Sequence, residues 1–191
     1  MNKALLLHGW GGNSNENWLP WLQNELNKKL FDVYNPNLPN TDNPVLDEQN
    51  ETIRVYSSKF KDGGYIIGHS LGCQLAVKYI EENKIKNSVI ILVAPTYPGL
   101  AKELGKDVLD DSYESIEKYY NTNIDFESIN KLKNKYYVFV SDNDPYINME
   151  NAKKYYSQLN NVNFLDFHNK GHFNKDAGVL EIKEIFNYIN F

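Results

Sequence analysis

The chain has 191 residues, of which 41% are hydrophobic and 24% charged, a composition typical of one globular domain and unlike that of disordered or fibrous proteins. Its 25 acidic residues outnumber its 20 basic ones and give a net charge of −5, so nucleic acids and anionic membranes are not expected as partners. One cysteine excludes an intramolecular disulfide, and the apolar run 4–7 is too short for a signal peptide, so we expect a cytoplasmic protein.

The predicted elements alternate between short apolar strands and segments with apolar residues at helical spacing. In chain order they are strand 4–7, helix 18–26, strand 31–34, helix 53–60, strand 65–67, helix 71–79, strand 89–93, strand 136–140, helix 152–159, strand 162–165 and helix 180–189. Strands 89–93 and 136–140 are apolar at every position, which is typical of strands covered on both faces. The alternation predicts a three-layer α/β domain over residues 1–191, with a mostly parallel six-stranded sheet.

The connection 95–135 is unusually long. It contains the helical-looking stretches 113–120 and 126–132. A functional lid and a set of extra surface helices explain such an excursion equally well.

A G-x-S-x-G motif, Gly68-His69-Ser70-Leu71-Gly72, joins the strand 65–67 to the helix that follows it. This context is typical of a nucleophile elbow, a strained turn in which the residues two before and two after the serine must be small. We therefore predict Ser70 as a nucleophile, an incidental glycine-rich turn being the alternative. The start of the helix favours the negative charge that develops beside Ser70.

The sequence His8-Gly9-Trp10-Gly11-Gly12 follows the first predicted strand. Glycines at the carboxyl end of a parallel strand leave backbone N–H groups free to face a ligand. One of these groups is expected to pair with the N–H of Leu71 as an oxyanion hole. The spacing differs from that of phosphate-binding glycine motifs, so nucleotide binding is not expected.

Two acids follow the strand 136–140, in the loop Ser141-Asp142-Asn143-Asp144-Pro145. Asp144 lies deeper in this loop, where its carboxylate can face a histidine while Pro145 stiffens the backbone. Asp142 is the alternative, with a turn or cap as its simpler role.

The histidines are His8, His69, His168 and His172. The first three have packing or hydrogen-bonding explanations, whereas His172 lies beside a glycine in the loop after the last strand. The chain order Ser70, Asp144, His172 is that of α/β-hydrolase triads and differs from the orders on chymotrypsin-like and subtilisin-like folds. We expect no metal site, because no H-E-x-x-H or H-x-H spacing occurs, and Cys73 is expected to be a packing residue rather than a nucleophile.

On these motifs the chain resembles the α/β-hydrolase superfamily, and more closely the small serine hydrolases related to retinoblastoma-binding protein nine. The matching segments are residues 8–12, 68–72, 141–146 and 171–174. The resemblance implies Ser70 as nucleophile, His172 as base and Asp144 as the orienting acid. It also implies Trp10 and Leu71 as oxyanion N–H donors, with Gly11 as the alternative to Trp10.

Two departures from the family are visible. The first predicted strand begins near residue 3, so the antiparallel hairpin that opens larger α/β-hydrolases must be missing. The L-x-C-x-E motif is also absent, because Leu75 stands where glutamate is required, and binding to the retinoblastoma protein is therefore not carried over.

The expected function is cleavage of a small ester through an acyl-enzyme, without a cofactor and with a small-molecule acyl substrate as the partner. Four loop aromatics are predicted to form a small pocket for this substrate: Trp10, Tyr97, Tyr146 and Phe173. A thioesterase, an amidase and an acyltransferase with the same triad are alternatives, and so is a non-catalytic interaction protein on a hydrolase scaffold.

Overall fold

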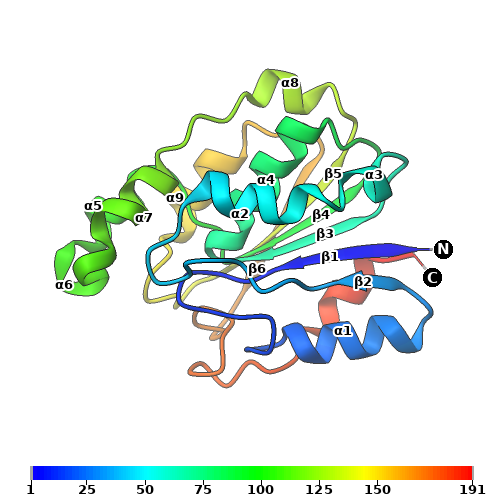
Figure 1. Cartoon of the computed structure of the whole chain (residues 1–191). Coiled ribbons are helices and arrows are strands. Elements are labelled where there is room, and N and C mark those ends of the chain that lie inside the picture. Colours follow the sequence, from blue (N-terminus) through cyan, green and yellow to red (C-terminus); the bar gives the residue numbers. More distant parts are fainter. Residues whose placement is uncertain (1, 191) are drawn as a thin grey trace.

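A six-stranded sheet forms the centre of the molecule (Figure 1), and a computed structural model describes it over residues 2–190. The strands are β1 (Lys3–Leu7), β2 (Asp32–Tyr34), β3 (Tyr65–His69), β4 (Val89–Val93), β5 (Lys135–Ser141) and β6 (Val162–Phe167). Their order in the sheet is β2-β1-β3-β4-β5-β6, and each neighbouring pair is parallel. The prediction of a mostly parallel six-stranded α/β fold is confirmed, and all the carboxyl ends of the strands share one edge.

Helices cover both faces of this sheet. They are α1 (Leu19–Lys28), α2 (Leu46–Arg54), α3 (Ser57–Phe60), α4 (Leu71–Asn83), α5 (Leu100–Leu104), α6 (Lys106–Leu109), α7 (Tyr113–Tyr120), α8 (Phe126–Asn130) and α9 (Met149–Tyr156), with 3-10 helices η1 (Asp110–Ser112) and η2 (Lys183–Tyr188). In Figure 1, α1 and η2 lie on one face while α2 and α4 lie on the other. The rings of Trp21 and Phe186 join α1 to η2 at 5.6 Å.

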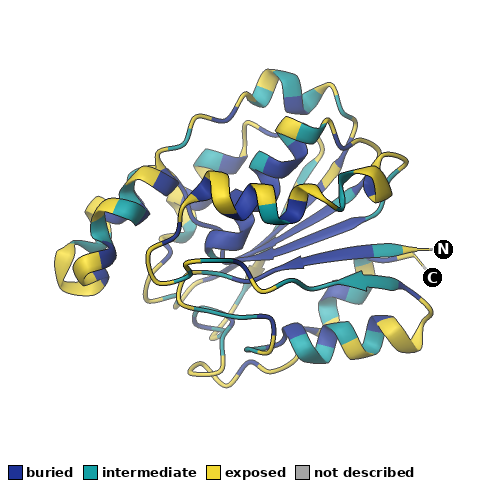
Figure 2. Cartoon of the chain, viewed as in Figure 1, coloured by how far each residue is buried: buried dark blue, intermediate teal, exposed yellow. Residues whose placement is uncertain are grey.

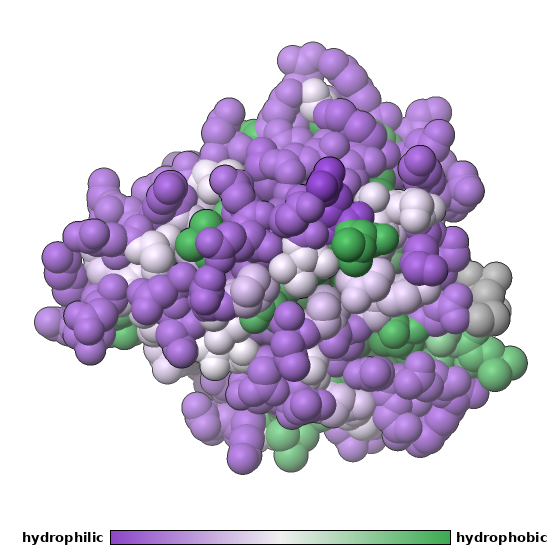
Figure 3. Space-filling model, viewed as in Figure 1, coloured by the Kyte–Doolittle hydropathy of each residue, from purple (hydrophilic) through white to green (hydrophobic). Residues whose placement is uncertain are grey.

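The core lies between these layers, as the buried strands in Figure 2 show. β4 is buried from Ile90 to Val93, and β3 is buried along its whole length, as expected for central strands covered on both faces. The face drawn in Figure 3 is largely hydrophilic, with small separate apolar patches. Each helix within residues 2–190 is too short or too polar to cross a lipid bilayer.

Two predicted helices differ from the structure. The helix expected over 53–60 begins earlier, as α2 at Leu46, and a break separates it from α3. Its inward face includes Gln49 and Asn50, whose polar side chains are buried and interrupt the apolar periodicity. Gln49 is accommodated there because its amide donates to the carbonyl of Pro39 and accepts from Tyr119.

The helix predicted over 180–189 is instead the shorter 3-10 helix η2, Lys183–Tyr188. Ile182 and Ile185 are buried and Tyr188 stacks on Tyr137 at 4.1 Å, so the residues facing the sheet recur every third position. That spacing matches the 3.0 residues per turn of a 3-10 helix.

The excursion 95–135 folds as α5 to α8, and α7 covers the predicted range 113–120. Its α5 and α6 extend away from the sheet in Figure 1. Hydrogen bonds anchor α7 to the body, from the Tyr119 hydroxyl to Gln49 and from the Gln74 amide to the carbonyl of Tyr120, both at 2.9 Å.

Candidate active site

Ser70 lies at a sharp turn between β3 and α4, with φ 54° and ψ −121°. This left-handed conformation is strained for a residue with a side chain. A Cβ atom at Gly68 would lie 2.7 Å from the carbonyl oxygen of Gly72, and one at Gly72 would overlap the carbonyl of Leu7 at the end of β1. Only glycine fits at both positions, and the Ser70 N–H is tied to the carbonyl of Val93 at 2.9 Å.

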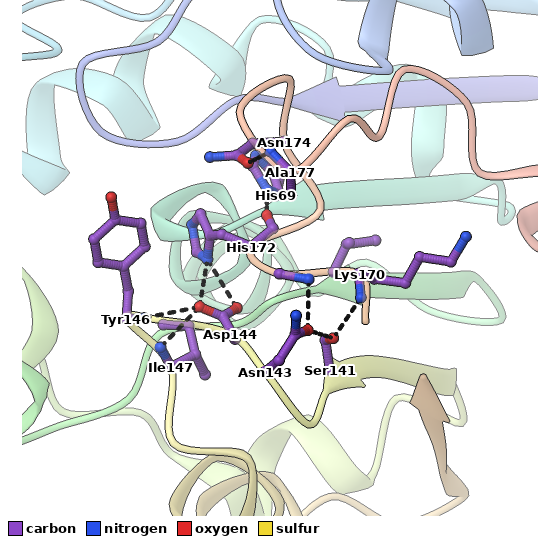
Figure 4. Close-up of polar contacts among 12 residues, drawn as sticks. His69, Ser141, Asn143, Asp144, Tyr146, Ile147, Lys170, His172, Asn174 and Ala177 are labelled. Carbon is purple, nitrogen blue, oxygen red and sulfur yellow. Dashed lines mark hydrogen bonds and ion pairs between the residues drawn. The ribbon is translucent and has the colours of Figure 1, made fainter. Parts of the chain in front are cut away.

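His172 and Asp144 meet in the loops that follow β6 and β5 (Figure 4). The imidazole Nδ1 lies 2.9 Å from Oδ2 of Asp144 and 3.2 Å from Oδ1. The Asp144 side chain is only 1% exposed, and its Oδ1 also accepts the N–H groups of Tyr146 and Ile147. The carboxylate is thus fixed by the backbone, and it holds Nδ1 as the donor, which leaves Nε2 of His172 as the proton acceptor.

The competing acid, Asp142, lies in the same loop but faces another histidine. Its Oδ2 is 2.6 Å from Nδ1 of His168, a side chain that is 81% exposed, and its Oδ1 accepts the N–H of Asn169. These hydrogen bonds, that of His168 first, lower the pKa of Asp142. Of the two acids, only Asp144 contacts His172.

The loop after β5 also holds the backbone of the loop after β6. The Ser141 hydroxyl accepts the N–H of Lys170 at 3.0 Å, and Oδ1 of Asn143 accepts the N–H of Gly171 at 2.8 Å (Figure 4). The Ser141 hydroxyl also donates to Asn143, so the two side chains brace each other. Sequence reasoning assigned neither residue a role, although both belong to the motif that contains Asp144.

His8 and His69 lie at the ends of β1 and β3. Nε2 of His8 accepts the N–H of Leu38 at 2.9 Å, and its Nδ1 donates to the carbonyl of Gly9. Burial lowers the pKa of His8, and burial followed by the nearby His172 lowers the pKa of His69 to about 3. Both imidazoles are therefore neutral at pH 7.

The loop 8–12 packs directly against the elbow. A Cβ atom at Gly9 would lie 2.9 Å from that of Ser70. The N–H of Gly11 donates to the carbonyl of Thr41 at 2.9 Å and is engaged, whereas the N–H groups of Trp10 and Leu71 make no backbone hydrogen bond within residues 2–190. The Trp10 side chain is fixed by a bond from its Nε1 to the carbonyl of Asp42.

A cavity of about 250 Å³ contains both Ser70 and His172. Of the aromatics predicted to bind substrate, Trp10 and Tyr146 line this cavity and are 36% and 43% exposed. The prediction is wrong for Tyr97, which is buried with its hydroxyl bonded to Glu103, and for Phe173, which is buried against Phe167. Burying these large apolar rings in the core lowers the free energy of the folded protein more than leaving them exposed on a loop.

The cavity has a mixed lining. Apolar side chains from the excursion and from the loop after β5 contribute to it: Leu100, Leu104, Val108, Tyr120 and Ile147. Polar side chains also line it: Glu16, Asn17, Asn174 and Asp176. No lysine or arginine lines it among the described residues. The i, i+4 spacing of Leu100 and Leu104, both in α5, was a sequence signal that could have identified part of this apolar lining.

The model of the family described as "Serine hydrolase" matches residues 4–190. YdeN of Bacillus subtilis (strain 168), a hydrolase by name, is 23% identical over 189 residues, which are 98% of this chain and 94% of YdeN.

The solved structures that resemble this fold include that of the ydeN gene product. Its TM-score is 0.83 at 21% identity, covering 98% of this chain and 96% of that chain. Est1E from Butyrivibrio proteoclasticus, solved with ferulic acid bound, has a TM-score of 0.70 at 14% identity and covers 98% and 89%. A carboxylesterase structure from Nitrososphaera gargenis has a TM-score of 0.69 at 15% identity and covers 97% and 87%.

Proposed function

Because the chain belongs to the serine hydrolase family, we propose that Ser70, His172 and Asp144 are its catalytic triad and that they cleave a small carboxylic ester. The observation that carries this proposal is the buried contact of 2.9 Å between His172 and Asp144, because His172 lines the same cavity as the strained Ser70. The contact supports an oriented base, and the turn supports an exposed nucleophile.

The proposed reaction proceeds through an acyl-enzyme. Oγ of Ser70 attacks the ester carbonyl while Nε2 of His172 accepts its proton, and His172 then returns that proton to the departing alcohol. Asp144 keeps the imidazole in the required tautomer and stabilises the imidazolium. Water, deprotonated by the same histidine, releases the carboxylic acid and regenerates Ser70.

We further assign the oxyanion hole to the backbone N–H groups of Leu71 and Trp10. Leu71 is the first residue of α4, where backbone donors are unused and the helix dipole favours negative charge. Within residues 2–190 the N–H of Trp10 makes no backbone hydrogen bond, whereas that of Gly11 is engaged, which favours Trp10 over Gly11. Two such donors stabilise the tetrahedral intermediate.

The cavity favours a short substrate. Its volume of about 250 Å³ lies just below the ~300–1,000 Å³ of drug-sized ligand sites, and leucine and valine side chains contribute to its lining. We therefore assign it to esters with short, uncharged aliphatic acyl groups. Because Est1E is described with ferulic acid bound, a feruloyl ester belongs in the test panel as a bulky contrast.

A fluorophosphonate probe and a panel of p-nitrophenyl esters test this function. Wild-type protein is expected to react with the probe and to cleave acetate and butyrate esters, whereas Ser70→Ala loses both activities. Ser157→Ala, which removes an exposed serine at the end of α9, serves as the matched control. Equal labelling of Ser70→Ala and wild type would contradict the proposal, and faster cleavage of matched thioesters or amides would change the substrate class.

A further inference from the structure

His69 is a buried imidazole that takes no part in the proposed chemistry. It is the last residue of β3 and directly precedes Ser70. Its Nε2 lies 2.9 Å from the backbone carbonyl oxygen of His172, and the two imidazole rings lie 5.1 Å apart. A hydrogen bond therefore joins β3, the strand that leads to Ser70, directly to the backbone of His172 (Figure 4).

The direction of this hydrogen bond follows from its partner. A carbonyl oxygen only accepts, so the proton of the neutral imidazole must be on Nε2 of His69. The neutral form is assured by burial, which with the nearby His172 lowers the pKa of His69 to about 3. The titratable groups around it are His172, from the loop after β6, and His8, from the end of β1.

The ring of His69 is itself held in place. Trp18, which is fully buried just before α1, packs against it edge-on at 5.8 Å. A ring fixed by packing keeps its N–H aimed in one direction, so its hydrogen bond constrains the carbonyl that accepts it.

The opposite side of the His172 backbone is fixed as well. The preceding N–H, that of Gly171, donates to Oδ1 of Asn143 at 2.8 Å, while Asp144 holds the imidazole itself. All of these contacts come from the loop after β5. His69 is the anchor from β3, the strand that also positions Ser70.

We propose that His69 is a positioning residue, which sets the base against the nucleophile by donating Nε2–H to the carbonyl of His172. This inference rests on the proposed function of Ser70 and His172. Loss of the bond removes the hydrogen bond that ties the His172 backbone to β3, so its Nε2 loses its alignment with Ser70. A misplacement of about 1 Å costs about 100-fold in rate, and the loss is expected in kcat rather than in KM.

Two amides of different length test the hydrogen bond. In His69→Gln the side-chain amide nitrogen reaches the place of Nε2, whereas in His69→Asn it stops one methylene short. His69→Gln is expected to keep kcat within about tenfold of wild type, and His69→Asn and His69→Phe to lose about 100-fold with KM nearly unchanged. Equal kcat values for the folded Gln and Asn variants would overturn the proposal.

A double-mutant cycle separates positioning from general support of the fold. In a His172→Ala background, the residual rate of fluorophosphonate labelling at Ser70 is expected to be the same whether residue 69 is His, Gln or Asn. The reason is that His172, the base that the His69 side chain aligns, is absent. A further loss of labelling rate in the His172→Ala background would overturn the proposal and leave His69 with a structural role. So would an equally large drop in melting temperature in His69→Gln and His69→Asn.

Failure of this inference is distinct from failure of the proposed function. If wild type and Ser70→Ala react equally with the probe, the triad assignment itself is wrong. If Ser70 is labelled and required but the His69 variants behave alike, only the positioning role is wrong.

Discussion

At the scale of single residues, Asp142 and Asp144 lie two positions apart and have different environments. Asp142 pairs with the exposed His168, whereas Asp144 is buried, bonded by two backbone N–H groups and in contact with His172. The contrast allows a matched pair of substitutions of the same chemistry in the same loop.

Asp144→Asn is expected to lower kcat by about 10³–10⁴-fold, because an amide cannot stabilise the imidazolium and favours the wrong tautomer of His172. The fold should persist, since the Asn oxygen can still accept the N–H groups of Tyr146 and Ile147. Steady-state kinetics with a short ester measure the loss. Asp142→Asn is the control and should stay within about threefold of wild type, so a comparable loss there would contradict the choice of Asp144.

His69 also makes a prediction about acid stability. Its pKa is about 3 in the folded protein and 6.5 ordinarily, so between these values the unfolded chain binds more protons. The free energy of unfolding should therefore fall as the pH drops from about 6.5 to about 3, by up to about 1.4 kcal/mol per pH unit from this group. Below about pH 3 its contribution levels off.

Urea unfolding of wild type and His69→Gln at several pH values between 7 and 3 measures this dependence. The variant lacks the ionisable group and should show a shallower slope. The buried His8, whose pKa is also lowered, contributes in the same direction in both proteins and does not affect the difference. Parallel slopes would contradict the neutral, buried state of His69.

At the scale of elements, the elbow depends on close contact between α4 and β1. A Cβ atom at Gly72 would overlap the carbonyl of Leu7 and lie 2.6 Å from that of His8, and backbone atoms of a central strand cannot move aside. We therefore expect Gly72→Ala to lower the free energy of unfolding by about 3 kcal/mol. Chemical denaturation measures the change.

Gly12→Ala provides the comparison within the same region. The nearest atoms to its Cβ would be the carbonyl of Gly9 at 3.2 Å and the side chain of Glu16 at 3.3 Å, and the latter can rotate away. A cost of less than about 1 kcal/mol is expected. Similar costs for the two substitutions would show that the elbow tolerates separation of α4 from β1.

The strands were predictable from sequence because branched and aromatic residues gather in runs such as 89–93, which coincides with β4. The helices were harder to predict where polar residues face the core, as Gln49 does in α2. They were also harder to predict where the residues that face the sheet recur every third position, as in η2. In these cases tertiary hydrogen bonds and ring stacking decide the local structure, and neither appears in a local pattern.

The candidate site was likewise predictable where sequence motifs decide it and unpredictable where tertiary packing does. The motifs placed Ser70, Asp144 and His172 at one sheet edge, because parallel strands bring their carboxyl ends together. The lining of the cavity was not predictable in this way: whether a loop aromatic turns outward like Tyr146 or inward like Phe173 depends on the space that the core leaves open.

At the scale of the whole molecule, charge is expected to govern substrate choice. The protein carries a net charge of −5, and Glu16 and Asp176 line the cavity. An ester with an anionic acyl group, such as a hemisuccinate, should have a kcat/KM about tenfold below that of the matching butyrate ester. The ratio of kcat/KM for the butyrate ester to that for the hemisuccinate ester should move toward one in about 0.5 M salt, because screening weakens the repulsion between the substrate and the protein.

Glu16→Gln tests how much of this repulsion comes from a charge that lines the cavity, and it should move the same kcat/KM ratio toward one at low salt. Glu127→Gln, which removes an exposed charge on α8, changes the net charge equally and is the control. If both variants alter the ratio to the same extent, the overall charge governs selectivity and the cavity wall does not.

The order of the proposed triad along the chain affects how the proposed activity is acquired during synthesis. The elbow belongs to β3 and α4, whereas the base lies beyond β6, the last strand, and is held by the loop after β5. Domains emerge from the ribosome with their N-terminal portion first. On the proposed mechanism, a nascent chain therefore carries Ser70 through most of translation without its proton acceptor, and hydrolysis begins only once β6 has joined the sheet.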